Sequence, residues 1–160
     1  MDYKIRRFKK GDEDAIVSLI RRTLREVNIK DYSKETIEKI VKEFSPNIIL
    51  NRAKSFHMYV AVVSDLIVGV GAIGPYWDSL TEYCILNLYV LPEYENMGIG
   101  KAILNALEED EFFRKAERIE VSSTISAVSF YEHMGYVFKK DGDKLDLERY
   151  YRLEKFPHKN

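Results

Sequence analysis

Residues 85–104 read I-L-N-L-Y-V-L-P-E-Y-E-N-M-G-I-G-K-A-I-L, and this stretch decides the fold. It opens with an apolar run of strand length, which stops at Pro92 because proline cannot donate a hydrogen bond to a sheet ladder. A short polar turn follows, and Gly98 and Gly100 lead into a helical pattern with its apolar residues on one face. The sequence therefore predicts a strand, a glycine-bearing loop and a helix in immediate succession.

The loop between this strand and this helix has the physical properties of an anion site. The first turn of a helix carries unpaired backbone N–H groups and a partial positive charge, and glycines let a phosphate approach them closely. A Walker loop does not fit, because Glu95 stands where it needs glycine and Ala102 where it needs Ser or Thr. A dinucleotide fingerprint does not fit either, because Ile103 replaces its third glycine. A glycine-started helix without a ligand is the alternative that this stretch leaves open.

A second segment, residues 124–136, reads T-I-S-A-V-S-F-Y-E-H-M-G-Y. Together the two segments resemble the GNAT superfamily of acyl-CoA N-acyltransferases. The family's pyrophosphate loop, Q/R-x-x-G-x-G/A after a V-x-P strand end, is matched by Val90, Pro92, Gly98 and Gly100. Its later motif, N-x-x-A-x-x-F-Y-x-x-x-G-F, is matched by Ala127, Phe130, Tyr131 and Gly135, with Tyr136 for the final Phe. Glu95 departs from the family's Gln or Arg, and Thr124 from its Asn.

The resemblance implies acetyl-CoA as co-substrate and no metal. In the family the central strand and the next one separate near a bulge, and this gap leaves backbone groups without partners. The pantetheine arm fills the gap and pairs with them. The pyrophosphate would lie on the N–H groups of residues 96–101. The implied cofactor-binding residues are Leu88, Tyr89, Val90, Glu95, Asn96, Met97, Gly98, Ile99, Gly100, Lys101, Thr124, Ser126 and Tyr131.

The resemblance also implies direct acetyl transfer without a covalent enzyme intermediate. Tyr131 matches the family's general acid, which protonates the departing thiolate. Many relatives carry a glutamate as base six residues before the Val90 position, where this chain has Cys84. Glu82 lies on the same strand face two residues earlier, and we expect it to accept a proton directly or through water, although an exposed glutamate at a strand start is equally consistent. Cys84 is expected to be a small buried strand residue and not a nucleophile.

The remaining pattern predicts one α+β domain over residues 1–160, with a three-layer α/β arrangement. Its centre is a mixed, mostly antiparallel sheet of six to seven strands flanked by helices. Ser33 and Ser45 are predicted to cap two helices before the first hairpin, whose turn is Ser64-Asp65. The helix after Gly98 is expected to run to about Phe113, with the acidic residues 108–111 as a solvated face.

Composition narrows the function classes. Lys and Arg number 25 against 26 Asp and Glu, so the formal net charge of −1 argues against a general nucleic-acid or membrane-surface binder. A single cysteine excludes an internal disulfide and fits the cytoplasm, and residues 1–4 begin no apolar signal segment. The three histidines (His57, His133 and His158) lack zinc-site spacing.

Two function hypotheses follow. The first is an N-acetyltransferase that acts on a primary amine of a small molecule or peptide, and the second is a non-catalytic acyl-CoA-binding or sensing module. The second is suggested by Glu95, Thr124 and Cys84 at altered positions. The expected lips of the acceptor site are residues 21–33, 76–78 and 141–143. The pattern does not identify the acceptor, and it leaves a homodimer open.

Overall fold

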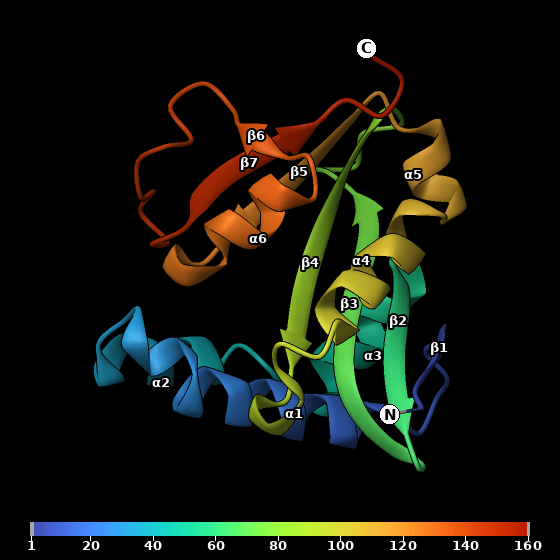
Figure 1. The fold of residues 1–160 in the computed structure, drawn as a ribbon, viewed down its shortest axis with the longest axis vertical. Coiled ribbons are helices and arrows are strands. Elements are labelled where there is room, and N and C mark those ends of the chain that lie inside the picture. Colours follow the sequence, from blue (N-terminus) through green and yellow to red (C-terminus); the bar gives the residue numbers. More distant parts are fainter. Residues whose placement is uncertain (1, 160) are drawn as a thin grey trace.

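A computed structural model describes residues 2–159, so residues 1 and 160 of the predicted domain lie outside the described range. It contains a seven-stranded sheet in the order β1-β2-β3-β4-β5-β7-β6, with helices on its faces (Figure 1). The strands are β1 (Lys4–Arg7), β2 (His57–Val63), β3 (Leu66–Pro75), β4 (Glu82–Val90), β5 (Arg118–Ser123), β6 (Val137–Phe138) and β7 (Tyr151–Lys155). Among the strands of residues 2–159, only the β4–β5 pair is parallel, and the predicted mixed, mostly antiparallel α+β sheet is confirmed.

The helices fall in three places along the chain, between β1 and β2, between β4 and β5, and between β5 and β6. They are α1 (Glu13–Glu26), α2 (Lys34–Val41), α3 (Pro46–Ser55), α4 (Ile99–Glu108), α5 (Glu111–Lys115) and α6 (Val128–His133), with 3-10 turns η1 (Asn28–Lys30), η2 (Pro92–Tyr94) and η3 (Ile125–Ala127). Ser33 and Ser45 cap α2 and α3 as predicted, because their hydroxyls accept the backbone N–H groups of Thr36 and Ile48. Both hairpin-turn residues, Ser64 and Asp65, have positive φ, as a tight turn of this kind requires.

Strands β4 and β5 pair over only part of their length. Their register runs from Glu82 opposite Arg118 to Ile85 opposite Val121, and no further pairs follow. The two strands start together and then diverge, so the second half of β4 has β3 alone as a partner (Figure 1). The backbone edge of β4 beyond Ile85 therefore faces a gap in the sheet.

A bulge marks the point of divergence. Val70 of β3 pairs with Tyr89 and Ala72 pairs with Leu86, so Gly71 alone lies opposite two β4 residues. One of these two, Asn87, has a φ of 59°, a left-handed conformation that Asn adopts more readily than most residues. The extra residue bends β4 and re-aims its side chains next to the gap.

Helix α4 packs unusually close to the sheet. Its face of Ile99, Ile103, Leu104 and Leu107 is fully buried. A Cβ atom at Gly69 or Gly71 of β3 would come within 2.7 or 2.8 Å of the Ile103 side chain, so glycine at these positions lets the helix pack there without displacing Ile103. The packing fixes the N-terminus of α4 beside the end of β4.

The predicted helix to Phe113 is wrong in one respect, because it breaks into α4 and α5 at Asp110. The predicted solvated face at residues 108–111 holds for Glu109 and Glu111, which are exposed, but not for Asp110, which is 5% exposed and caps α5 by accepting a hydrogen bond from the backbone N–H of Phe112. Its carboxylate also accepts a hydrogen bond from the Tyr59 hydroxyl at 2.6 Å and contacts His57 Nδ1 at 2.8 Å. A local helical pattern could not reveal these partners, because they come from β2.

Candidate active site

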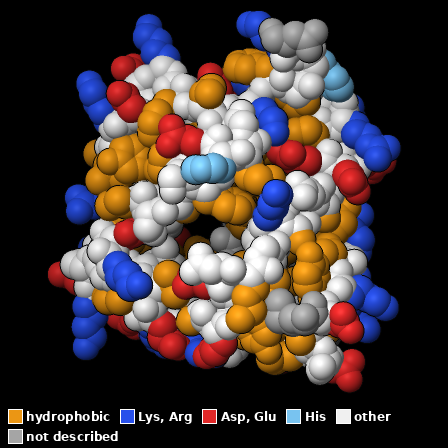
Figure 2. Space-filling model, viewed as in Figure 1, with side chains coloured by type: hydrophobic (Ala, Val, Ile, Leu, Met, Phe, Trp, Pro, Cys, Tyr) orange, Lys and Arg blue, Asp and Glu red, His pale blue; other side chains and the backbone are white. Residues whose placement is uncertain are grey.

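The gap between β4 and β5 opens into a cleft of about 1050 Å³. Its walls come from the second half of β4, the loop before α4, the segment from β5 to α6, and the region from α1 to α3. The space-filling view shows a hollow near the centre of this face (Figure 2). A cleft of this size, between layers that are otherwise packed, has room for an extended ligand.

The loop before α4 presents a row of free backbone donors. Asn96 and Gly98 have φ values of 60° and 83°, and the first intrahelical hydrogen bond is from Ala102 N to Gly98 O. Within residues 2–159, the N–H groups of residues 96–101 therefore have no backbone acceptor. Consecutive N–H groups around left-handed residues at a helix N-terminus form a concavity suited to an anion.

Space for that anion is present at Gly100. A Cβ atom there would be 3.8 Å from its nearest neighbours, Phe130 and Val90, which is ordinary van der Waals contact. The protein's own packing thus does not require glycine at this position. A phosphate that approaches the backbone closely here would require glycine.

Most of the predicted cofactor residues line this one cleft. They are Leu88, Tyr89, Val90, Glu95, Asn96, Gly98, Gly100, Lys101, Thr124, Ser126 and Tyr131. Met97 and Ile99 do not line it: the Met97 side chain is exposed, and the Ile99 side chain is in the core. For these two residues only the backbone N–H groups remain candidates for ligand contact.

Tyr131 lies on α6, with its ring packed edge-on against Phe130 and Tyr136. It is 6% exposed, yet it borders the cleft. Burial raises the pKa of Tyr131 well above its ordinary value, so its hydroxyl stays protonated throughout the neutral range. It is therefore available as a hydrogen-bond and proton donor.

Ser126 already has a protein partner. Its backbone N–H and its hydroxyl both donate to Asp31 Oδ2, at 3.0 and 2.7 Å. Next to this contact, the Tyr32 hydroxyl donates to the carbonyl of Arg149 at 2.6 Å. The segment after α1 is thus tied across the cleft to η3 and to the chain before β7.

Glu82 and Cys84 are placed outside the residues that line the cleft. The Glu82 carboxylate pairs with Arg118, with Oε2 at 3.2 Å from Nε, and this position does not support direct proton transfer from a substrate in the cleft. The route through water stays a prediction. Burial raises the pKa of Cys84 to about 12, which agrees with an inert strand residue.

The sequence predicted only some of the residues that line the acceptor side of the cleft. The expected lip at residues 21–33 contributes Thr23, Val27, Asn28 and Lys30, whereas residues 76–78 and 141–143 do not line the cleft. The structure adds Glu43, Phe44, Arg52, Asn87, Ser122, Glu148 and Tyr150. Ser122 follows directly after the part of β5 that pairs with β4, and Asn87 lies two residues beyond the part of β4 that pairs with β5. Nothing local marks the others.

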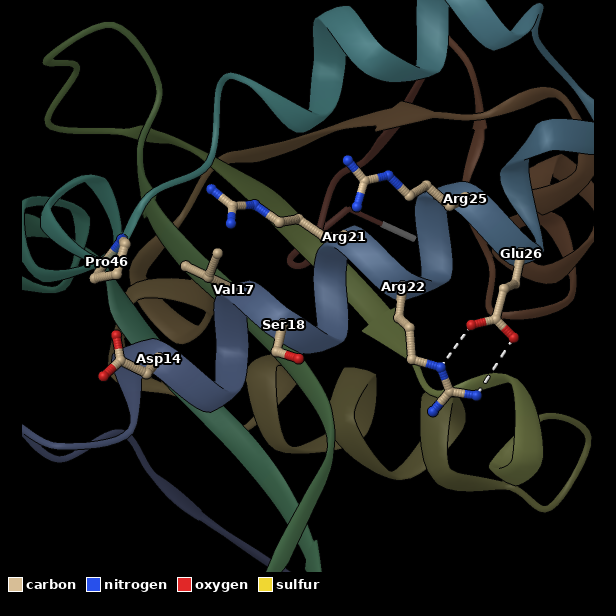
Figure 3. A pocket seen from close by; sticks show the side chains of 8 residues that line it. All are labelled: Asp14, Val17, Ser18, Arg21, Arg22, Arg25, Glu26 and Pro46. Atoms are coloured by element: carbon tan, nitrogen blue, oxygen red, sulfur yellow. Dashed lines mark hydrogen bonds and ion pairs between the residues drawn. The ribbon is translucent and has the colours of Figure 1, made fainter.

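A second, shallower cavity of about 350 Å³ lies along the outer side of α1 (Figure 3). Its cations are largely engaged: Arg22 pairs with Glu26 and with Glu93, and Arg25 pairs with Glu38. None of the predicted catalytic or cofactor-binding residues lines this cavity, although Arg21, Arg22, Arg25 and Glu26 of the predicted lip at residues 21–33 do. We therefore place the candidate site in the central cleft.

The described residues contain neither a candidate metal site nor a candidate membrane-spanning helix. Within residues 2–159, no three His, Cys, Asp or Glu side chains gather in a way that could hold a metal ion. None of the helices in that range combines the length and apolar character needed to cross a bilayer.

The fold matches several solved acetyltransferases. PaiA N-acetyltransferase from Thermoplasma acidophilum, in complex with coenzyme A, superimposes with a TM-score of 0.83 at 21% identity, over 98% of this chain and 99% of that chain. A GCN5-related N-acetyltransferase from Rhodopseudomonas palustris gives 0.77 at 18% identity, over 98% and 96%. A GNAT family acetyltransferase from Brucella melitensis, in complex with acetyl-CoA, gives 0.68 at 18% identity, over 97% and 88%.

These identities are low, and they establish a common fold alone. No curated protein sequence gives a significant match. A family comparison is more direct: the model of the acetyltransferase (GNAT) domain matches residues 54–138, which is more than half of the 160 residues and includes both glycines of the loop and Tyr131. The chain belongs to the GNAT acetyltransferase family.

Proposed function

We propose that this chain is an enzyme that transfers the acetyl group of acetyl-CoA to a primary amine by direct attack, and that residues 1–160 form one acyltransferase domain. The observation that carries the proposal is the convergence of three features on one cleft. These are the free N–H groups of residues 96–101, the unpaired edge of β4 and the Tyr131 side chain. Each suits a different part of an acetyl-CoA molecule.

The cofactor would bind mainly through the backbone. Its pyrophosphate would lie on the N–H groups of residues 96–101, and its amide-bearing arm would pair with Leu88, Tyr89 and Val90 at the unpaired edge of β4. The neighbours solved with coenzyme A and with acetyl-CoA support this proposal, since they share the fold. Thr124 and Ser126 would line the arm from the opposite wall.

The reaction then needs no covalent intermediate on the protein. The amine nitrogen attacks the thioester carbon, a tetrahedral intermediate forms, and the carbon–sulfur bond breaks. The Tyr131 hydroxyl donates its proton to the departing thiolate, and the nitrogen loses a proton to solvent or, through water, to Glu82. Burial raises the pKa of Tyr131, so the hydroxyl keeps its proton until the thiolate departs.

The second candidate is an acyl-CoA-binding or sensing module without catalysis. It is favoured by Glu95 near the phosphate loop and by the absence of a carboxylate base among the β4 residues that line the cleft. Both candidates predict cofactor binding, and only the first predicts turnover.

The deciding experiment combines calorimetry with thiol release. Calorimetry measures acetyl-CoA binding to the purified chain, and a thiol reagent follows free coenzyme A as a panel of primary amines is added. Amine-dependent thiol release together with an acetylated product supports the enzyme. Acetyl-CoA binding without thiol release for any amine would instead support the acyl-CoA-binding module.

A further inference from the structure

Arg52 carries the best-fixed charge on the acceptor side of the cleft. It projects from α3, and its Nη1 donates to Asn87 Oδ1 at 2.6 Å. Asn87 is the left-handed bulge residue at which β4 leaves β5. The guanidinium is therefore held where the sheet opens, and it lines the cleft there.

This guanidinium has donors to spare. An arginine side chain carries five N–H donors, and the Asn87 bond uses one of them. Within residues 2–159, no carboxylate forms an ion pair with Arg52. A fixed guanidinium without an anionic partner, at the wall of a cleft, is suited to an anionic ligand group.

Ser122 places a second donor at the same opening. It follows Val121, the last β5 residue paired with β4, and it lines the cleft. Its hydroxyl oxygen accepts a hydrogen bond from Arg152 Nη1 at 2.6 Å, so its own hydrogen is free to be donated. The opening of the sheet is thus bordered by donors from two different elements.

The other charges near this opening are exposed or already neutralised. Lys30 and Glu43 line the cleft but are exposed, and the Glu148 side chain is 75% exposed. Buried Glu120 is paired with Arg118 and Lys139, and Asp146 is paired with Arg152. Exposed charges are screened by solvent, so Arg52 dominates the recognition of a charged acceptor.

We infer that Arg52, with Ser122 as a further donor of the same cleft, binds a carboxylate of the acceptor, which makes the acceptor a small amine that also carries a carboxylate, such as an amino acid. This inference rests on the proposed acetyl transfer. Asn87 is a positioning residue, since it holds the guanidinium.

The test uses matched amines that differ by one carboxylate. The pairs are methionine with 3-(methylthio)propylamine, phenylalanine with phenethylamine, and lysine with cadaverine. We expect at least one pair in which the carboxylated member has a kcat/KM about 10-fold or more higher. Arg52→Gln should raise the KM of that member by about 10- to 100-fold, the range for loss of a charged hydrogen bond, and leave its carboxylate-free partner almost unchanged. Arg52→Lys should restore part of the preference.

Two controls separate specificity from damage. Lys54→Gln removes an exposed cation of the same helix, α3, outside the cleft lining, and should leave the preference intact. Asn87→Gly keeps a left-handed backbone accessible while it frees the guanidinium, and it should reduce the preference less than Arg52→Gln does. Melting curves and acetyl-CoA calorimetry on each variant check that the fold and the cofactor site are unchanged.

Three results would overturn the inference. The first is an equal or better rate with the carboxylate-free amines, and the second is a preference that survives Arg52→Gln. The third applies if no amine turns over: the coenzyme A complex then binds N-acetylmethionine no more tightly than its decarboxylated analogue, or binds it equally well in Arg52→Gln. Failure of the parent protein to bind acetyl-CoA would instead overturn the proposed function, and the calorimetry detects that separately.

Discussion

Asp31 Oδ2 accepts two hydrogen bonds from Ser126, one from its backbone N–H at 3.0 Å and one from its hydroxyl at 2.7 Å. The two residues are 95 positions apart and join the segment after α1 to the turn before α6. This contact bridges the cleft and occupies both donors of a residue that the family motif assigns to the cofactor. A cofactor that uses Ser126 has to displace Asp31 first.

Asp31→Ala should therefore tighten acetyl-CoA binding while it lowers the melting temperature. Removing the carboxylate frees the Ser126 donors, and a net hydrogen bond of about 1 kcal/mol corresponds to an affinity gain of roughly five-fold. Calorimetry on Asp31→Ala and on the Asp31→Ala, Ser126→Ala double variant measures the effect. Equal affinities in these two variants would mean that Ser126 does not touch the cofactor.

Gly100→Ala should fold normally and lose acetyl-CoA affinity. The added methyl group meets only ordinary contacts at 3.8 Å, so the melting temperature should shift little. In the complex the same methyl group would stand between the phosphate and the backbone N–H groups. Gly100→Glu adds a like charge and should abolish binding. Unchanged acetyl-CoA affinity in either variant would show that the phosphate does not bind to this loop.

Glu95→Gln should strengthen acetyl-CoA binding. Glu95 is exposed and lines the cleft beside the phosphate loop, so its charge repels the pyrophosphate. Solvent screens this repulsion, and the gain should be largest at low ionic strength and fade as salt is added. A salt titration by calorimetry measures it, with the exposed Glu93→Gln variant as a control at the same turn. No difference at low salt would show that the Glu95 carboxylate points away.

Tyr131→Phe should leave stability and cofactor affinity nearly unchanged and lower kcat by roughly 10²- to 10⁴-fold, the usual effect of losing a general acid. The ring keeps its edge-on contacts with Phe130 and Tyr136, and the phosphate contacts that we propose involve backbone groups elsewhere. Paired melting curves and initial rates make the comparison. Full activity in a folded variant would show that the hydroxyl is structural and would favour the acyl-CoA-binding module.

Asp110→Ala should destabilise the chain strongly, whereas Glu109→Ala, which removes an exposed neighbour, should not. The buried Asp110 carboxylate accepts bonds from Tyr59, Phe112 and His57, and losing such a group leaves these donors unpaired at a cost of about 2–4 kcal/mol. Chemical denaturation of both variants measures the difference. Similar unfolding free energies would mean that water replaces the carboxylate.

The same carboxylate gives the stability a defined pH dependence. Burial acts to raise the pKa of Asp110, but the hydrogen bonds from Tyr59, Phe112 and His57 outweigh burial, and the net pKa is lowered. A lowered folded-state pKa stabilises the protein above the unfolded-state pKa, and this contribution is lost as the pH falls through the folded-state value. The acid-induced loss of stability should therefore be smaller in Asp110→Ala than in the parent.

More of the predicted cofactor-binding residues than of the predicted acceptor lips line the central cleft. Pro92, Gly98 and Gly100 act on the backbone of their own segment, so the end of β4, the loop and the start of α4 could be read locally. The helix caps at Ser33 and Ser45 were predictable for the same reason. Placing Glu82 in the site relied on strand alternation, which gives the face of a residue but not its distance from the cleft.

What the sequence by itself determined is therefore the succession of elements and the family to which the chain belongs, because both depend on residue types at short, fixed spacings. Only the tertiary structure decided which side chains share the cleft. Arg52 meets Asn87 across 35 positions, Ser126 meets Asp31 across 95, and Asp110 meets His57 across 53. Such contacts follow from the packing of α3, η1 and β2 against the divided sheet, and no local pattern specifies where a distant element will end.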